Sequence, residues 1–211
     1  MNSITSQPVE DYMYGLLPPR DAVLAEMEEL ARKERIPIVG PAVGQLFYQL
    51  ARLTNAKRIF EMGSAIGYST IWWARGARAE AKVYYTDGTP ANAQKAEDYT
   101  KRAGVRDRIE VMVGNSLDLI DQVDGEFDII FNDVDKHYYP EVFRKVAGRV
   151  RIGGLFVTDN VLWSGRVADP SQKDADTEGV RTFNEMLFAD ERYHASIVPL
   201  RDGVGIGLRL R

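Results

Sequence analysis

The chain has 211 residues, of which 45% are hydrophobic and 27% are charged, a mixture typical of a globular protein that can bury a sizeable core. It contains no cysteine, which excludes disulfide bonds, thiolate nucleophiles, cysteine-ligated zinc and iron–sulfur clusters. A net charge of −4 gives no general attraction to nucleic acid or to an anionic membrane, and no apolar run approaches the roughly 20 residues of a membrane helix. Because the N-terminal residues do not resemble a signal peptide, we expect a cytoplasmic protein.

The first quarter of the chain is predicted to be helical. A short helix is expected at 9–15, and a longer one follows Asp21, whose side chain can cap it. A third helix at 41–53 begins with proline, a residue that the first helical turn tolerates well. We therefore predict a single domain, with a helical cap segment at 1–56 and a core at 57–211.

From residue 57 onward, strands and helices alternate. Strands are expected at 58–62, 82–86, 108–113, 127–131 and 155–158. Helices are expected between them at 68–78, 90–103, 116–122 and 138–149. This alternation predicts right-handed βαβ units and a parallel sheet with helices on both faces. The near-continuous apolar strands fit burial on both faces.

The last part of the chain has a different pattern. A helix at 176–188 precedes strands at 193–199 and 204–209, and Asp202-Gly203 between these strands indicates a hairpin turn. The predicted fold class is therefore α/β: a doubly wound, mostly parallel seven-stranded sheet that ends in an antiparallel hairpin.

A glycine turn follows the first predicted strand and opens the next helix. It contains Gly63 and Gly67, and such a turn at the carboxyl edge of a sheet is a ligand cradle. The spacing does not match the dinucleotide fingerprint G-x-G-x-x-G, and no Lys-Ser/Thr pair follows, which argues against a P-loop. The alternative is that the two glycines only make a tight turn.

Two acids accompany the glycine turn. Asp87 closes the second strand, where one carboxylate can accept hydrogen bonds from both ribose hydroxyls, although it could instead cap the next helix. Glu61 adds negative charge beside the turn. Two carboxylates disfavour a phosphate-rich ligand and favour a cationic one, such as a sulfonium. Ser116, in the turn that ends the third strand, is placed to flank an adenine.

A second polar group follows the fourth and fifth predicted strands. Asp133 ends one strand and Asp159-Asn160 ends the next, so their side chains can converge at the carboxyl edge of the sheet. Three oxygen ligands suit Mg²⁺, Mn²⁺ or Ca²⁺ and leave positions open for two vicinal hydroxyls of a substrate. Lys136 stands three residues after Asp133 and is a candidate general base.

Each of these residues also has a structural interpretation. Asp133 and Asp135 could cap the helix near residue 138, and Asp159-Asn160 could form an Asx turn. Lys136 could be a solvated partner of Glu141. Their joint placement at two consecutive strand ends, downstream of a candidate cofactor turn, favours a functional site.

Several motifs of the chain resemble those of the cation-dependent class I S-adenosylmethionine O-methyltransferases, a family that includes the caffeoyl-CoA and catechol O-methyltransferases. The resemblance covers about 9–209 and rests on E-M-G-S-A-I-G-Y-S, D-V-D-K-H-Y-Y, T-D-N-V-L-W-S-G-R-V-A-D-P, R-T-F-N-E-M-L-F-A-D-E-R and D-G-V-G-I-G-L. It implies a Rossmann-like core, a homodimer, and N-terminal helices that help close the site.

The resemblance also implies a role for each candidate residue. A divalent metal, most simply Mg²⁺, would be held by Asp133, Asp159 and Asn160, with Lys136 as the base. S-adenosylmethionine would contact Val39, Glu61, Gly63, Ser64, Tyr68, Ser69, Asp87, Ser116, Asp133 and Asp135. The substrate would meet Tyr139, Trp163 and Ser164.

We therefore expect an S-adenosylmethionine-dependent and metal-dependent O-methyltransferase that acts on a vicinal-dihydroxy, catechol-like phenol. Two alternatives stay open: methylation of a wobble-uridine hydroxyl of tRNA on the same fold, and a non-catalytic cofactor-binding module. Ser164 stands where the plant enzymes have a substrate-contacting asparagine, so plant-type specificity is not carried over. Met62 and Asn132 stand where the family commonly has branched aliphatic residues.

Overall fold

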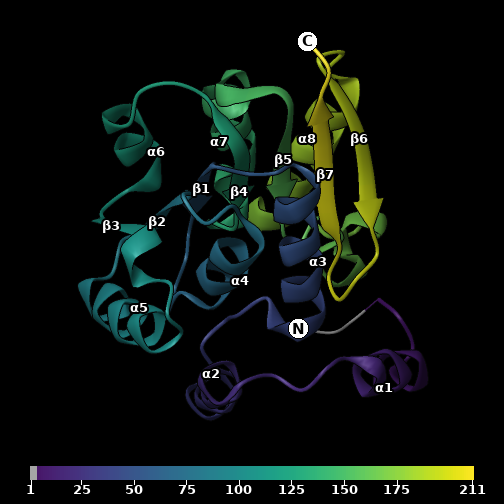
Figure 1. Cartoon of the computed structure of the whole chain (residues 1–211). Helices are drawn as coiled ribbons and strands as arrows, with labels where there is room; N and C mark the ends of the chain where they lie inside the picture. Colours follow the sequence, from purple (N-terminus) through teal and green to yellow (C-terminus); the bar gives the residue numbers. More distant parts are fainter. Residues whose placement is uncertain (1–3) are drawn as a thin grey trace. The chain divides into compact units, whose positions relative to one another are not determined.

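The computed structural model describes residues 4–211 (Figure 1). These residues divide into two compact units. The first unit comprises Met13–Asp124, and the second comprises the segment up to Tyr12 together with Gly125–Arg211. No helix within residues 4–211 is both long and apolar enough to cross a membrane. The prediction of a single domain with a cap segment stays a prediction.

The first unit contains three parallel strands in the order β3-β2-β1. They are β1 (Arg58–Met62), β2 (Lys82–Asp87) and β3 (Ile109–Val113). The helices after residue 57 in this unit are α4 (Tyr68–Gly76), α5 (Pro90–Arg102), η1 (Arg106–Arg108), α6 (Ser116–Leu119) and η2 (Ile120–Gln122). Strands β1 and β2 are almost entirely buried, as their continuous apolar sequence predicts.

The N-terminal helices are α1 (Gln7–Leu16), α2 (Ala22–Glu34) and α3 (Gly40–Leu53). Asp21 caps α2, as predicted, by accepting hydrogen bonds from the backbone N–H groups of Val23 and Leu24. Helix α3 packs closely on α4, where Phe47 stacks on Trp73 with 4.2 Å between ring centroids. These contacts bury the helix that follows the glycine turn.

The second unit contains four strands in the order β4-β5-β7-β6. They are β4 (Phe127–Asn132), β5 (Val150–Thr158), β6 (Tyr193–Val198) and β7 (Val204–Arg209). Strands β4 and β5 are parallel, whereas β7 is antiparallel to both β5 and β6. The β6–β7 pair is the predicted hairpin, drawn in yellow in Figure 1.

Helices α7 (Tyr139–Val146) and α8 (Ala175–Ala189) belong to the same unit. The aromatic rings of Phe143, Phe156 and Phe183 meet within 6.0 Å of one another and join these helices to β5.

Some predicted boundaries were wrong. Strand β5 begins at Val150, well before the predicted residue 155, although Gly153 and Gly154 interrupt the apolar pattern. The helix predicted at 138–149 consists of three pieces, η3 (Lys136–Tyr138), α7 and η4 (Ala147–Arg149). The irregular helical turn η5 (Trp163–Ala168) was not predicted.

Candidate active site

The glycine turn at 63–67 has a left-handed backbone. Gly63, Ala65 and Gly67 have φ angles of 85°, 44° and 84°. A Cβ atom on Gly67 would lie 3.0 Å from the Cβ of Ala96, so both the backbone conformation and the close approach of α5 favour glycine there. The N–H of Gly67 donates to the carbonyl of Ser64 at 2.8 Å and closes the turn.

The carboxylate of Asp87 organises the turn and the start of α5 together. Its Oδ2 accepts a hydrogen bond from the N–H of Ala65 at 3.0 Å, and its Oδ1 accepts from the N–H of Thr89 at 2.8 Å and from Asn92 Nδ2 at 3.1 Å. Asp87 therefore does support the following helix, as the structural interpretation proposed. A carboxylate has about four acceptor positions, so capacity for a ribose hydroxyl remains.

Glu61 and Tyr68, which lie beside the glycine turn, are both buried. Glu61 has no exposed surface, and the hydroxyl of Thr70 donates to its Oε2. The hydroxyl of Tyr68 donates to Glu28 Oε1 at 2.8 Å, and Glu28 forms an ion pair with Arg20 at 3.0 Å. Burial raises the pKa of Tyr68 far above its ordinary value, so it is a neutral hydrogen-bond donor. Helix α2 is thus fastened to the first turn of α4.

The other residues of the first unit that were predicted to contact the cofactor are all buried. The backbone N–H of Thr86 donates to Ser64 Oγ at 3.2 Å, which joins β2 to the glycine turn. Asn115 caps α6 by accepting from the N–H of Leu117 at 2.9 Å. The remaining residues are Val39 at the start of α3, Ser69 in α4 and Ser116 in α6.

In the second unit, β4 and β5 end side by side. Asn132 and Thr158 are partners in the parallel register, and the N–H of Asp159 donates to the carbonyl of Asn132 at 3.2 Å. Asp133 therefore follows one strand end, and Asp159 with Asn160 follows its neighbour. The side chains of Asn132 and Thr158 are fully buried with no hydrogen-bond partner among the described residues.

Lys136 lies beside this pair of strand ends. Its Nζ donates to Asp133 Oδ1 at 2.9 Å and to the carbonyl of Val134 at 3.3 Å, and its side chain is only 14% exposed. The alternative in which Lys136 is a solvated partner of Glu141 is therefore wrong. We refer to Asp133, Lys136 and Asp159 as the carboxylate cluster.

The carboxylate cluster holds more negative charge than its one lysine can neutralise. Burial, reinforced by the charge of Asp133, raises the pKa of Asp159 to about 7. Burial also raises the pKa of Asp133, although Lys136 opposes this effect. Burial alone would lower the pKa of Lys136, but the nearby Asp133, Tyr139 and Asp159 together raise it above its ordinary value. A buried and a half-buried carboxylate that repel each other form an environment that favours an additional cation.

Aromatic side chains surround the lysine. Its Nζ lies 5.5 Å from the ring centroid of Tyr139 and 5.6 Å from that of Trp163. Tyr139 has no exposed surface, and its hydroxyl donates to the carbonyl of Asp159 at 2.9 Å. This position makes Tyr139 a residue that orients Asp159, whereas Trp163 is partly exposed.

The segment after Asp159 has an unusual backbone. Asn160, Trp163 and Ser164 have φ angles of 59°, 45° and 53°, in the left-handed region that non-glycine residues seldom adopt. The N–H of Ser164 donates to the carboxylate of Asp202, which is 1% exposed. Asp202 and its neighbour Arg201 were not predicted to serve the site, because Asp202-Gly203 was interpreted only as a hairpin turn.

Arg201 acts on the cluster through its charge, which lowers the pKa values of both Asp133 and Asp159 against the effect of burial. Asp135 is exposed and makes no side-chain capping bond, so the proposed capping role for it is not realised. His137 is also exposed, with its Nδ1 at 2.9 Å from Asp176 Oδ1.

The described residues therefore contain two groups with separate chemistry: a glycine turn with acids, and a buried carboxylate cluster with a lysine. A family model described as O-methyltransferase matches residues 19–210 of the chain. The chain belongs to the O-methyltransferase family.

Curated relatives of this methyltransferase include a catechol O-methyltransferase of Niastella koreensis, which is 34% identical over 206 residues and matches 95% of this chain and 93% of the relative. A probable O-methyltransferase of Mycobacterium tuberculosis is 30% identical over 191 residues, which are 90% of this chain and 85% of the relative.

Solved structures agree over nearly the whole chain. An O-methyltransferase from Bacillus cereus in complex with SAH has a TM-score of 0.87 at 30% identity, with 96% of this chain and 97% of that chain covered. TomG from Streptomyces achromogenes, an O-methyltransferase involved in tomaymycin synthesis and solved with SAM, has a TM-score of 0.88 at 32% identity, with 97% and 96% covered.

These similarities confirm two predictions. The fold is that of the class I methyltransferases, with a mostly parallel seven-stranded sheet that ends in an antiparallel hairpin. The chain is an S-adenosylmethionine-dependent O-methyltransferase. The alternative of a non-catalytic cofactor-binding module is therefore not supported.

Proposed function

We propose that this methyltransferase depends on a divalent cation and methylates a vicinal-dihydroxy phenol. The observation that carries the proposal is the pair of carboxylates, the half-buried Asp133 and the buried Asp159, at the adjacent ends of β4 and β5. Lys136, the candidate base, is hydrogen-bonded to one of them.

The residues present fit a hard cation. Within residues 4–211 no cluster of three or more acidic or histidine side chains is arranged to hold a metal, so the proposed set needs the amide oxygen of Asn160 beside the carboxylates of Asp133 and Asp159. Carboxylate and amide oxygens without sulfur or imidazole suit Mg²⁺ best and also Mn²⁺ or Ca²⁺. Burial of Asp159 and, secondly, repulsion by Asp133 raise the pKa of Asp159 to about 7, and a cation would oppose both effects.

Each residue of the cluster then has a task. A bound divalent cation would polarise the acceptor hydroxyls and oppose the effect of the carboxylates on the pKa of Lys136. Once its own pKa is lowered in this way, Lys136 would lose a proton to solvent, and its neutral Nζ would then accept the proton of the reacting hydroxyl. Tyr139 holds the backbone of Asp159 in place through its hydroxyl, and Asp202 holds the backbone of Ser164.

The methyl donor is assigned to the glycine turn. Gly63 and Gly67 let the cofactor approach the backbone, and Asp87 has acceptor capacity left for a ribose hydroxyl. The buried charge of Glu61 favours a cationic sulfonium over a phosphate-rich nucleotide. Contacts from Val39, Ser64, Tyr68, Ser69, Ser116, Asp133 and Asp135 belong to the same proposal.

The acceptor class follows from the cluster and from the relatives. The catechol O-methyltransferase of Niastella koreensis is 34% identical over nearly the whole chain, which supports a catechol-like acceptor here. Trp163, whose ring lies beside Lys136, is the proposed wall for the aromatic ring, and Ser164 follows it. We also propose that the enzyme is a homodimer and is cytoplasmic. The mass of the purified enzyme in solution tests whether it is a dimer.

A tRNA acceptor is less well supported, because two of the basic residues that could bind RNA have acidic partners. Arg102 pairs with Glu26 and Asp98, and Arg106 pairs with Glu97. Neutralised charges contribute little to phosphate binding.

An acceptor panel tests the proposed substrate class. The purified enzyme receives labelled S-adenosylmethionine, Mg²⁺ and one of four acceptors: catechol, a caffeoyl ester, a flavonoid with vicinal hydroxyls, or unmodified tRNA. Phenol and resorcinol are the matched controls, because they lack two adjacent hydroxyls. We expect transfer to vicinal diphenols and none to the controls. Transfer to phenol at the rate seen with catechol, or to tRNA alone, contradicts the proposed acceptor.

A further inference from the structure

The segment 160–174, which connects β5 to α8, carries the proposed substrate residues Trp163 and Ser164. We call it the acceptor loop. It contains the kinked turn η5, in which Ser164 and Gly165 have φ angles of 53° and 77°. Such a backbone persists only where surrounding contacts hold it. The contacts that hold the acceptor loop therefore bear directly on the proposed substrate site.

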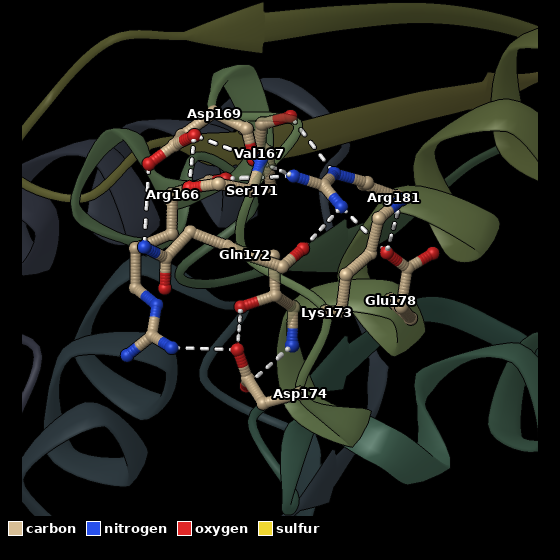
Figure 2. A network of polar contacts seen from close by, with 10 residues as sticks. Arg166, Val167, Asp169, Ser171, Gln172, Lys173, Asp174, Glu178 and Arg181 are labelled. Carbon is tan, nitrogen blue, oxygen red and sulfur yellow. Dashed lines mark hydrogen bonds and ion pairs between the residues drawn. The ribbon is translucent and has the colours of Figure 1, made fainter.

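The main contact comes from Arg181 in α8, whose side chain is only 18% exposed (Figure 2). Its Nε donates to the carbonyl of Val167 at 2.9 Å. Its Nη1 donates to the carbonyl of Gln172 at 2.7 Å and to Glu178 Oε1 at 2.6 Å. Its Nη2 donates to the carbonyl of Arg166 at 2.9 Å and to that of Asp169.

All five N–H donors of the guanidinium are thus used, four of them on backbone carbonyls of one loop. The planar fork of arginine places these donors in a fixed geometry, whereas lysine has three donors on a single atom. The four acceptors on the loop are backbone carbonyls and not charged side chains. The bonds from Arg181 therefore fix the course of the loop backbone and are not ion pairs with the loop.

The two ends of the acceptor loop are held by other contacts. At its start, the N–H of Val161 donates to the carbonyl of Gly203 at 3.0 Å and its carbonyl accepts from Asn184 Nδ2 at 2.8 Å. The N–H of Leu162 donates to the carbonyl of Asp202 at 2.9 Å. At its end, Asp174 caps α8. Within residues 4–211, the middle of the loop has only local side-chain bonds besides, from Arg166 to Asp174 and from Ser171 and Gln172 to Asp169. Loss of Arg181 would consequently remove the four bonds that tie the middle of the loop to α8, while Asn160, the proposed metal ligand, stays anchored through its neighbours.

We infer that Arg181 is a positioning residue that sets the affinity for the acceptor by holding the middle of the acceptor loop. The inference rests on the proposed function only for the identity of the acceptor. Arg181 acts through the backbone of residues 166–172, and its own hydrogen bonds reach neither the carboxylate cluster nor the glycine turn. Binding of the acceptor should therefore depend on Arg181, whereas binding of the cofactor and the chemical step should not.

The experiment compares Arg181→Lys and Arg181→Gln with Glu178→Gln. The lysine variant keeps the positive charge without the fork, and the glutamine variant removes the charge. Glu178→Gln is the matched control, because it keeps an acceptor for Arg181 and removes only the negative charge that pairs with Arg181 and Lys173. The measurements are amide hydrogen exchange over 163–173, the KM for catechol, kcat, and the affinity for S-adenosylhomocysteine. Quenching of tryptophan fluorescence by catechol, with Trp163→Phe as the blank, gives binding without turnover.

We expect faster exchange over 163–173 and a roughly tenfold higher KM for catechol in both Arg181 variants, with kcat and cofactor affinity within about twofold. Glu178→Gln should resemble the wild type. If Arg181→Gln fails to fold, Arg181→Lys carries the test. Unchanged exchange, or a fall in kcat at unchanged KM, overturns the inference, as does an equal effect of Glu178→Gln. If the wild type neither binds nor methylates a catechol, the proposed function fails, and hydrogen exchange alone decides whether Arg181 holds the loop.

Discussion

The glycine turn and the carboxylate cluster both lie where parallel strands end, but the two regions differ in the partners of their carboxyl groups. Around the glycine turn, both carboxyl groups accept hydrogen bonds from the protein: Asp87 accepts three, and Oε2 of the buried Glu61 accepts one from Thr70. In the carboxylate cluster, Asp133 and Asp159 share one lysine and their pKa values are raised.

This difference separates a preorganised site from one that requires a further charge. The glycine turn is held by hydrogen bonds within the protein, so a cofactor would add contacts to a turn that the protein itself holds in shape. The carboxylate cluster keeps charges that burial disfavours, so a cation there would relieve an existing cost. The predictions below test whether the two regions differ in this way.

The largest effect is expected from Asp159→Asn. Loss of a ligand charge should lower kcat by at least about 100-fold and weaken Mg²⁺ binding.

Without metal, Asp159→Asn should have a higher Tm than the wild type at pH 8. The folded-state pKa of Asp159, about 7, lies above its ordinary value of 3.8, so ionised Asp159 destabilises the fold fully above pH 7. Asp118→Asn on the exposed side of α6 is the control and should change neither quantity. Methyl transfer near the wild-type rate would remove Asp159 from the site.

Replacement of the base should be nearly as severe. Lys136→Met is expected to lower kcat by about 10²–10⁴-fold while Mg²⁺ still binds, because the variant loses the proton acceptor and keeps the oxygen ligands. Lys136→Arg is the informative partner variant, since a guanidinium stays protonated and cannot take the proton. Steady-state kinetics at saturating catechol and cofactor measures both. Substantial activity in Lys136→Arg would argue that Lys136 contributes only its charge.

In the glycine turn, substitution should affect binding more than chemistry. Asp87→Ala is expected to weaken S-adenosylhomocysteine binding by about 10–100-fold, the loss of a charged hydrogen bond. Turnover at saturating cofactor should change little. Asp87→Asn keeps one acceptor oxygen, for the N–H of either Ala65 or Thr89, so it removes the charge together with only part of the support of the turn. Calorimetry measures the affinity, and unaltered binding in both variants would place the ribose elsewhere.

A smaller effect is expected where the hairpin holds the acceptor loop. Asp202→Ala removes the acceptor for the N–H of Ser164, and we expect catechol affinity to fall about fivefold, the net worth of one hydrogen bond. Asp202→Asn retains an acceptor oxygen and should retain most of the affinity. Equal losses in the two variants would indicate that the carboxylate acts through its charge instead.

The smallest effect concerns stability in acid. Hydrogen bonds from the hydroxyl and N–H of Thr177, with the charge of Arg166, lower the pKa of Asp174 to about 2 from its ordinary value of 3.8. The stability that ionised Asp174 contributes is therefore present above pH 3.8 and lost as the pH falls toward 2. Asp174→Ala should lower Tm at pH 7, and the difference from the wild type should narrow below pH 3.8 in a thermal melt. A constant difference across this range would contradict the assignment.

Much of the fold could be predicted from the sequence because its signals are local. Asp21 caps α2 as expected, and β7 occupies the predicted residues. The start of β5 was missed because Gly153-Gly154 breaks the apolar run, although the strand continues through a register shift against β4.

The candidate site was predicted only as far as strand ends define it. Asp133 and Asp159 follow neighbouring strands, so their proximity follows from parallel pairing. Left-handed Trp163 and Ser164 have no sequence signature, because neither residue type favours that backbone. The role of Arg181 could not be predicted from the sequence, because it depends on how the loop that it binds is folded.

The metal requirement is tested most directly by methyl transfer to catechol at pH 8 after complete removal of divalent cations. Affinity for S-adenosylhomocysteine, measured on the same sample, reports that the glycine turn is intact. We expect transfer to fall to the uncatalysed background, added Mg²⁺ to restore it, and cofactor affinity to stay unchanged throughout. Full activity in the metal-free enzyme would contradict the assignment of Asp133, Asp159 and Asn160 as metal ligands.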